Sequence, residues 1–233
     1  MVHELTRNTI IKNYFLNKNG LYQILVLLTA FCLALVAFRI LYTGEWMFAF
    51  LIWNLFLAYL PYSLSSYIAR EERHMSKPFL ILLLITWLLL IPNSFYIITD
   101  LFHLRKQDVI PLWYDLALIM SFAWNGLIVG VLSVRQVEKI LQQRWHVYEW
   151  LFILPLMYLN ALGIFIGRYL RFNSWDVITN PVALIKDVVY LVIHPIRNRF
   201  DWCMIICFTV LLSIFYLTLK KMSKMNENEK GTQ

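Results

Sequence analysis

Six stretches of this sequence are long enough and apolar enough to cross a membrane, and together they make up about half of the chain. Eighteen residues of α-helix rise about 27 Å, close to the thickness of a bilayer's hydrocarbon core. Because lipid tails offer no hydrogen-bonding partners, spanning segments of this length form helices. The stretches cover approximately residues 21–38, 46–68, 79–98, 112–132, 150–166 and 202–219. The sequence therefore predicts an all-α fold, a polytopic transmembrane helix bundle of about six spans.

The charged residues are too few for a soluble domain of any size. They make up 15% of the 233 residues, against about a quarter in soluble proteins. A net charge of +7 would favour nucleic acid as the partner of a soluble protein. Here the Lys and Arg residues flank apolar segments, where they orient a membrane protein, so we expect a lipid bilayer and no nucleic acid. Cys32, Cys203 and Cys207 lie in apolar segments and predict no disulfide or zinc spacing.

The distribution of Lys and Arg predicts that both chain ends are cytoplasmic. With that topology, thirteen of these residues lie inside and eight outside, as the positive-inside rule requires. The domains expected are a cytoplasmic N-terminal segment at 1–20, a single bundle at 21–219 and a cytoplasmic tail at 220–233. All six Asp residues, Asp108 among them, lie in or beside the third and fifth loops, which are external in this topology. The fifth loop is an exception to the rule, since it carries five Lys and Arg residues.

The fifth loop also contains an apolar stretch that is too short to span. Asn180 can cap a helix and Pro181 suits its first turn. At helical spacing, the stretch to His194 gathers its more polar residues on one arc, with Val, Leu and Ile elsewhere. We expect a helix lying in the outer interface, with its apolar arc buried and Lys186, Tyr190 and His194 facing water. A re-entrant segment is the alternative.

Two longer motifs and three shorter ones resemble a bacterial family. The longer ones are PNSFYIITDLFHL at 92–104 and GRYLRFNSWD at 167–176; the shorter ones lie at 111–115, 121–126 and 54–58. The sequence is similar in these motifs to the domain of unknown function 1361 family of integral membrane proteins, over roughly residues 46–220. The resemblance implies a bacterial cytoplasmic-membrane protein, and it implies no activity or cofactor.

Acidic and histidine side chains gather at the predicted outer face. Asp100 and His103 are three residues apart, a spacing that places both on one helix face, where they could hold a cation or pair an acid with a base. Asp115, Asp176 and His194 also belong to this face, and such a set would suit a divalent ion. Helix capping and interface anchoring by solvated residues is the alternative, and we assign no metal ligand.

Arg168 and Arg171 at the outer end of the fifth span oppose the positive-inside rule, so something should offset their charge. One interpretation is ion pairing with Asp100, Asp115 or Asp176. The others are an anionic ligand, such as a lipid phosphate or carboxylate, held by the two guanidinium groups, or nonspecific contact with lipid headgroups.

The predicted spans contain four asparagines and two close-packing motifs. Buried amides need hydrogen-bonding partners, which neighbouring helices usually supply, and a polar path for a solute is the alternative. The amides are Asn54, Asn93, Asn125 and Asn160. Gly126-x-x-x-Gly130 and Gly163-x-x-x-Gly167 permit close approach of helices.

The function hypothesis is a membrane protein that binds or acts on an anionic lipid or a lipid-linked ligand at an outward-facing polar site. Its predicted ligand-binding residues are Asp100, His103, Asp115, Arg168, Arg171, Asn173 and Asp176. A small-solute permease and a structural or assembly subunit without ligand are the alternatives. The sequence leaves open the catalytic activity, the cofactor and whether the chain forms a homo- or hetero-oligomer.

Overall fold

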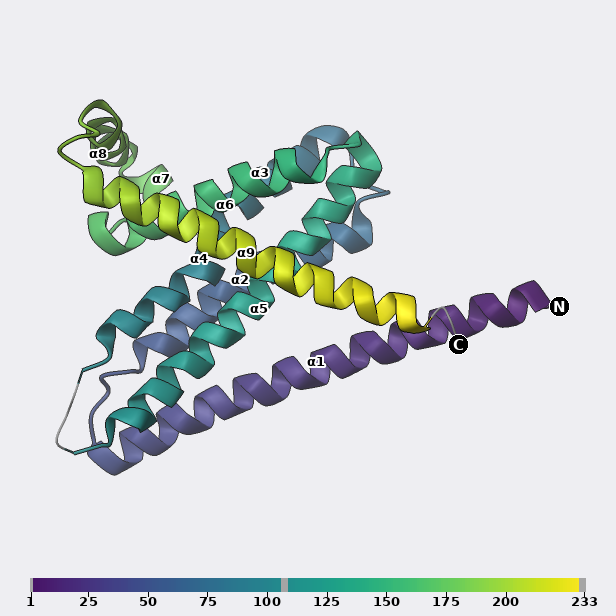
Figure 1. Ribbon diagram of the computed structural model, residues 1–233, viewed down its shortest axis with the longest axis horizontal. Coiled ribbons are helices and arrows are strands. Elements are labelled where there is room, and N and C mark those ends of the chain that lie inside the picture. The colour runs from purple at the N-terminus through teal and green to yellow at the C-terminus, as the bar shows by residue number, and fades with distance from the viewer. Residues whose placement is uncertain (1, 106–108, 231–233) are drawn as a thin grey trace.

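The computed structural model describes residues 2–105 and 109–230, and every regular element in that part of the chain is a helix (Figure 1). The elements are α1 (Val2–Thr43), α2 (Phe50–Glu71), α3 (Lys77–Leu90), α4 (Pro92–Tyr96), the 3₁₀-helix η1 (Ile97–His103), α5 (Leu112–Trp145), α6 (Glu149–Phe165), the π-helix η2 (Ile166–Leu170), α7 (Asp176–Thr179), α8 (Pro181–Ile193) and α9 (Arg199–Lys230). Asp108, the first residue and the last three of the predicted tail lie outside the described residues.

Five helical stretches in the described part are long and apolar enough to cross a membrane, which confirms a transmembrane helix bundle. They are Gly20–Thr43, Lys77–His103, Leu112–Trp145, Glu149–Leu170 and Arg199–Ser223. The sixth expected span corresponds to α2, whose 22 residues rise about 33 Å. It is less apolar than the others because it carries Asn54, Pro61 and several Ser and Tyr residues. Three of these polar side chains, Tyr59, Ser65 and Ser66, bond to α5.

The helices pack as two groups that share α5. In the first group α1, α2 and η1 surround the first half of α5, with a core that includes Val36, Leu55 and Phe122. In the second, α3, α4, α6 and α9 pack against each other and the later part of α5, around residues such as Trp87 and Met157. Figure 1 shows α7 and α8 at the left, at the same end as the α1–α2 connection, whereas both ends of the chain lie at the right. We call the left end the α8 end.

The short helix α4 fits between α5 and α6 because glycines face it on both sides. A Cβ on Gly126 would lie 2.9 Å from the backbone oxygen of Ser94, and one on Gly163 would lie 2.8 Å from Cβ of Pro92. Gly130 is equally close to Ser94. The structure therefore confirms close helix approach at both Gly-x-x-x-Gly motifs. Their partner is α4, not a second full-length helix.

Several buried polar groups inside the bundle are paired between helices, as predicted, but Asn160 is not. Its Nδ2 donates to Leu156 O of its own helix at 2.8 Å, and its Oδ1 accepts no hydrogen bond from the described residues. The hydroxyls of Thr29 and Tyr59 and the side chain of Asn125 form a closed triangle joining α1, α2 and α5, with distances of 2.9–3.1 Å. Ser133 of α5 accepts from the indole of Trp87 and donates to the carbonyl of Pro61. Such bonds are the expected answer to buried amides and hydroxyls in a membrane protein.

At the end opposite α8, a charged network ties the last helix to the bundle. Glu138 of α5 is 3% exposed and accepts from the hydroxyl of Tyr216 and the ammonium of Lys220, both of α9. Lys220 also lies 2.9 Å from a carboxylate oxygen of Glu149, at the start of α6. Three helices are thus joined by one lysine.

The predicted helix in the fifth loop exists as α8, a 13-residue helix distinct from the spans. Lys186, Tyr190 and His194 are exposed, as expected for residues facing water. Its apolar arc, however, is only partly covered by protein. Leu191 packs against Ala161, Phe165 and Ile205, while most of its Val and Ile side chains stay exposed. This exposed apolar surface suits a helix lying in the headgroup region.

Candidate functional site

The two longer sequence motifs meet at the α8 end, where Arg168 approaches Asp100. Arg168 Nη1 lies 3.6 Å from Asp100 Oδ1, and the side chain of Asp100 is 1% exposed. The other guanidinium nitrogen, Nη2, lies 3.1 Å from His103 Nδ1. The guanidinium carbon is 5.4 Å from the centre of the Phe102 ring. The ion pair expected for Arg168 is therefore present, and its partner is Asp100.

Irregular helix geometry produces this meeting. Pro92 ends the regular helix α3, and after α4 the chain tightens into η1, which carries Asp100 and His103. On the other side α6 widens into the π-helix η2, which carries Arg168. A π-helical turn adds a residue to the turn and redirects the side chains that follow, and such turns are frequent at functional sites. Arg171 then ends η2 with a left-handed φ of 62°.

Asp100 is held mainly by an amide, not by the guanidinium. Its Oδ2 accepts a 2.8 Å hydrogen bond from Nδ2 of Asn54 on α2. Its Oδ1 is buried and accepts no hydrogen bond from the described residues, since the contact with Arg168 is long. A buried carboxylate with one oxygen incompletely bonded is costly in most proteins, so this group is a candidate for a functional role.

Asp115, expected beside Arg168 or Arg171, pairs with Arg39 instead. Arg39 Nε donates to Asp115 Oδ1 at 2.8 Å, and both side chains are at most 2% exposed. The reason is packing, because α1 lies against α5 and brings its last turns to the first turn of α5. Arg39 also lies 4.4 Å from the centre of the Phe48 ring.

Asp176 and Arg171 belong to the connection after η2 and do not contact each other in any described ion pair. Asp176 accepts hydrogen bonds from the backbone nitrogen of Asn173 at 2.6 Å and from the hydroxyl of Thr179 at 2.9 Å. These bonds, the backbone one most, lower the pKa of Asp176 below its usual value. The carboxylate therefore closes the turn before α7. Arg171 is exposed, and no described carboxylate lies within ion-pair distance of it.

A cavity of about 360 Å³ lies next to the charged cluster. Its walls come from α2, the junction of α3 and α4, α6 with η2, the segment 172–177 and α8. Apolar side chains such as Leu88, Leu159 and Val177 form much of the lining, and each of the three is partly exposed. The volume is within the range of small-molecule sites.

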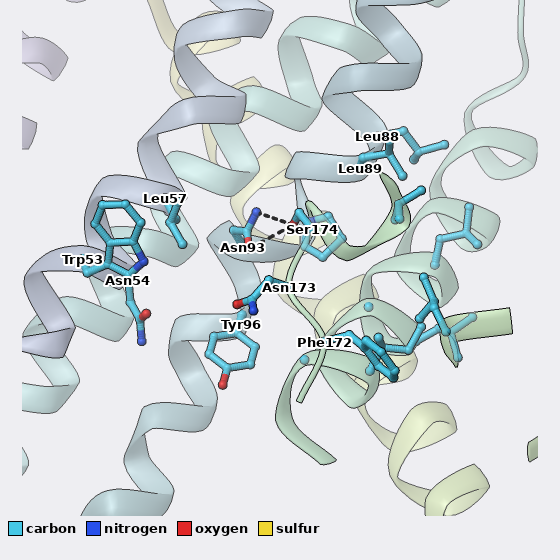
Figure 2. Close-up of a pocket in the computed structure, with 18 residues that line it drawn as sticks. Trp53, Asn54, Leu57, Leu88, Leu89, Asn93, Tyr96, Phe172, Asn173 and Ser174 are labelled. Carbon is cyan, nitrogen blue, oxygen red and sulfur yellow. Dashed lines mark hydrogen bonds between the residues drawn. The ribbon is translucent and has the colours of Figure 1, made fainter. Parts of the chain in front are cut away.

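The polar side chains of this cavity are amides and hydroxyls. Figure 2 shows Asn93, Asn173 and Ser174 close together, with Asn54 and Trp53 across from them on α2. Asn93 Nδ2 donates to Ser174 Oγ at 3.0 Å, which ties the segment after η2 to α4. No described lining residue is charged.

Of the seven predicted ligand-binding residues, Asn173 lines the cavity. Asp100, His103 and Arg168 form the cluster behind it, linked to it through Asn54, which lines the cavity and bonds to Asp100. Sequence reasoning took Asn54 and Asn93 as packing amides and did not assign them to this site. Their position within the family-like motifs at 54–58 and 92–104 was the available signal.

The described residues give no obvious metal centre, since they contain no group of three His, Cys, Asp or Glu side chains placed to share an ion. His194, one of the set of His and Asp residues that would suit a divalent ion, contacts the Tyr190 carbonyl and ring on α8.

Comparison with known proteins gives one family. The model of the family described as "Protein of unknown function (DUF1361)" matches residues 53–215. The match contains both longer motifs, the cavity and the charged cluster. No curated protein and no solved structure matches the chain.

Proposed function

We propose that this chain, which belongs to the DUF1361 family of proteins of unknown function, binds a lipid or a lipid-linked compound in the cavity between α2, α4 and α6. The observation that supports this most is the cavity's mixed lining. Apolar side chains that continue onto the lipid-facing surface surround a group of amides and hydroxyls. A ligand with an apolar chain and a polar group matches both parts.

The position of the apolar lining supports entry from the bilayer. Trp53 is 54% exposed and Leu159 is 42% exposed, yet both line the cavity. An acyl or isoprenoid chain can therefore remain in the hydrocarbon while its polar end enters between the helices. Trp53 is suited to this boundary because its ring is apolar and its N–H is a donor.

The anionic ligand expected from the two arginines has support at the rim of the cavity. Arg168 is occupied by Asp100 and His103. Arg171 is exposed, and the next residue, Phe172, lines the cavity. A phosphate of a lipid-linked ligand would thus lie outside, beside Arg171, where guanidinium and phosphate can pair without full desolvation.

A structural role is supported for the charged cluster itself. The contacts of Arg168 with Asp100 and His103 join η2 to η1, and these two segments adjoin two walls of the cavity. Holding them together fixes the positions of Asn54 and Asn93. The clasp and the ligand site are then parts of one arrangement.

The topology proposed has the α8 end outside the cell membrane and both chain ends in the cytoplasm, including segments 1–20 and 220–233. Both chain ends lie at one end of the bundle (Figure 1), and the excess of Lys and Arg belongs to that side. The proposed site then lies in the outer half of the membrane, with α8 at headgroup depth.

Native mass spectrometry of the chain, purified in a mild detergent from its host membrane, tests the proposal. We expect a lipid of defined mass to stay bound. Leu159→Trp adds an indole to the cavity wall and should reduce the retained fraction severalfold. Leu151→Trp, at an exposed position on the same helix outside the cavity, is the matched control and should retain the lipid. Equal retention by the two variants would contradict the proposal.

A further inference from the structure

The hydrogen-bonding groups left open in the cavity identify the kind of polar group that fits there. We infer that the cavity holds a neutral, hydroxyl-rich lipid head group, such as a sugar or another polyol, and not a phosphate or an ammonium group. This inference rests on the proposed function and narrows it to one class of ligand.

Two of the asparagines are oriented by partners that can only accept. Asn54 Nδ2 donates to a carboxylate oxygen of Asp100 at 2.8 Å. Asn93 Nδ2 donates to the backbone carbonyl of Leu90 at 2.9 Å. Because carboxylates and carbonyls have no proton to donate, the amide nitrogen must be the atom that faces them. The chemistry of the partner therefore determines which end of each amide, the nitrogen or the oxygen, is left to bond to a ligand.

The amide atoms that remain are the side-chain oxygens, which accept hydrogen bonds. Asn93 uses its second N–H on Ser174 Oγ, and its oxygen accepts one long hydrogen bond of 3.4 Å from the Ser174 hydroxyl. Asn173 Nδ2 lies 3.5 Å from a carboxylate oxygen of Asp176. Among the described residues none donates to Oδ1 of Asn54 or Asn173. The two amide oxygens without a described donor, and the weakly bonded oxygen of Asn93, suit a ligand that donates hydrogen bonds, as hydroxyl groups do.

The uncharged lining of the cavity disfavours charged head groups, such as phosphate and ammonium, in its interior. No described lining residue carries a charge. Asp100, which bonds to the lining residue Asn54, is 1% exposed, and Arg168 is turned to that carboxylate and to His103. Arg171 lies at the rim next to Phe172 and does not line the cavity itself. A phosphate or an ammonium ion placed among the amides would lose its water without gaining a counter-ion, which is unfavourable. Neutral hydroxyls lose little by comparison and gain the amide oxygens.

A lipid competition experiment tests this. The full chain in mild detergent is mixed with equal amounts of glucosyl diacylglycerol, phosphatidylglycerol and phosphatidylethanolamine carrying the same acyl chains. Retained lipid is measured by native mass spectrometry. We expect the glucosyl lipid to be retained most. Asn173→Ala should weaken its retention by about three- to tenfold, as for loss of one neutral hydrogen bond.

The matched control is Asn198→Ala. Asn198 is a half-buried asparagine whose Nδ2 bonds to backbone carbonyls, and it does not line the cavity. Its substitution should leave retention unchanged. We expect both variants to fold, because Asn173 is exposed and its side chain is not part of the core. A thermal unfolding curve for each variant checks this.

The outcomes separate the inference from the proposed function. Preferred retention of phosphatidylglycerol or phosphatidylethanolamine, blocked by Leu159→Trp, overturns the inference and leaves a lipid site. Glucosyl lipid retention that survives Asn173→Ala also overturns it. If Leu159→Trp changes the retention of none of the three lipids, the proposed function fails as well.

Discussion

The packing of α4 on α5 leads to a sharp prediction for Gly126→Ala. The added Cβ would lie 2.9 Å from the backbone oxygen of Ser94 and 2.9 Å from Cγ2 of Ile97. Ordinary contacts are 3.5–4.0 Å, so α4 must move by about 0.6 Å or more. The backbone oxygen cannot rotate away as a side chain could. The strain therefore falls on the position of a whole helix.

The expected cost follows from two opposing effects. Overpacking of this kind typically costs about 1–3 kcal/mol, while alanine is favoured over glycine within a helix by about 0.5–1 kcal/mol. The net destabilisation is about 0–2.5 kcal/mol, with a central value of about 1 kcal/mol. For a chain of this length, about 2–4 °C per kcal/mol gives a fall in Tm of about 2–4 °C at the central value and up to about 10 °C.

Thermal unfolding in detergent, followed by the fluorescence of the nine Trp residues, measures this shift. Gly20→Ala is the control, since Gly20 lies within α1 and a Cβ there meets no atom within 4 Å. Its Tm should stay the same or rise. If Gly126→Ala and Gly20→Ala have the same Tm, the close approach of α4 to α5 is wrong.

Three further predictions concern other parts of the molecule. Asp115→Asn should lower the free energy of unfolding by about 3–5 kcal/mol, because it removes the carboxylate that pairs with the buried guanidinium of Arg39; an unchanged Tm would contradict this. Because its pKa is lowered, Asp176 should stabilise its turn at neutral pH and lose this effect only as pH falls through that lowered pKa. Hydrogen exchange of the turn measures this, and an Asn variant should show no such acid dependence. In a background without the native cysteines, Gly44→Cys should be labelled when a membrane-impermeant thiol reagent is added outside the cell. His146→Cys should be labelled only when the reagent reaches the cytoplasmic face. The reverse pattern would refute the topology.

The helices were predictable because a backbone in lipid has few alternatives. Runs of about 20 apolar residues indicated the spans, and Asn180 with Pro181 marked the start of α8. Ion pairing of Arg168 or Arg171 with Asp100, Asp115 or Asp176 also followed from the sequence, since the two motifs end spans that run in the same direction. The structure shows which pair forms, Arg168 with Asp100. These predictions depended only on apolar length, the direction of the spans and the sign of the side-chain charges.

What escaped prediction depends on side-chain direction and on which helices are neighbours. Arg39 has the sequence position of an ordinary flanking charge, and nothing along the chain shows that α1 packs on α5 and buries it against Asp115. The cavity was missed for a similar reason. An asparagine within a span calls for a partner, but the sequence does not say whether that partner is a helix or a ligand. The change from α6 to the π-helix η2 has no clear sequence mark, and it sets where Arg168 and Asn173 lie.

The network around Glu138 has a consequence for the order in which the protein is made. Its partner Lys220 comes 82 residues later in the chain, which at about 5–20 residues per second is a delay of about 4–16 s. During that time α5 is already made and its carboxylate lacks the lysine that neutralises it in the finished bundle. The last helix therefore completes the charge balance as it completes the chain. A truncated chain that ends before Tyr216 lacks both α9 residues that bond to Glu138. Such a chain therefore keeps a carboxylate without these partners, which distinguishes it from the full-length chain.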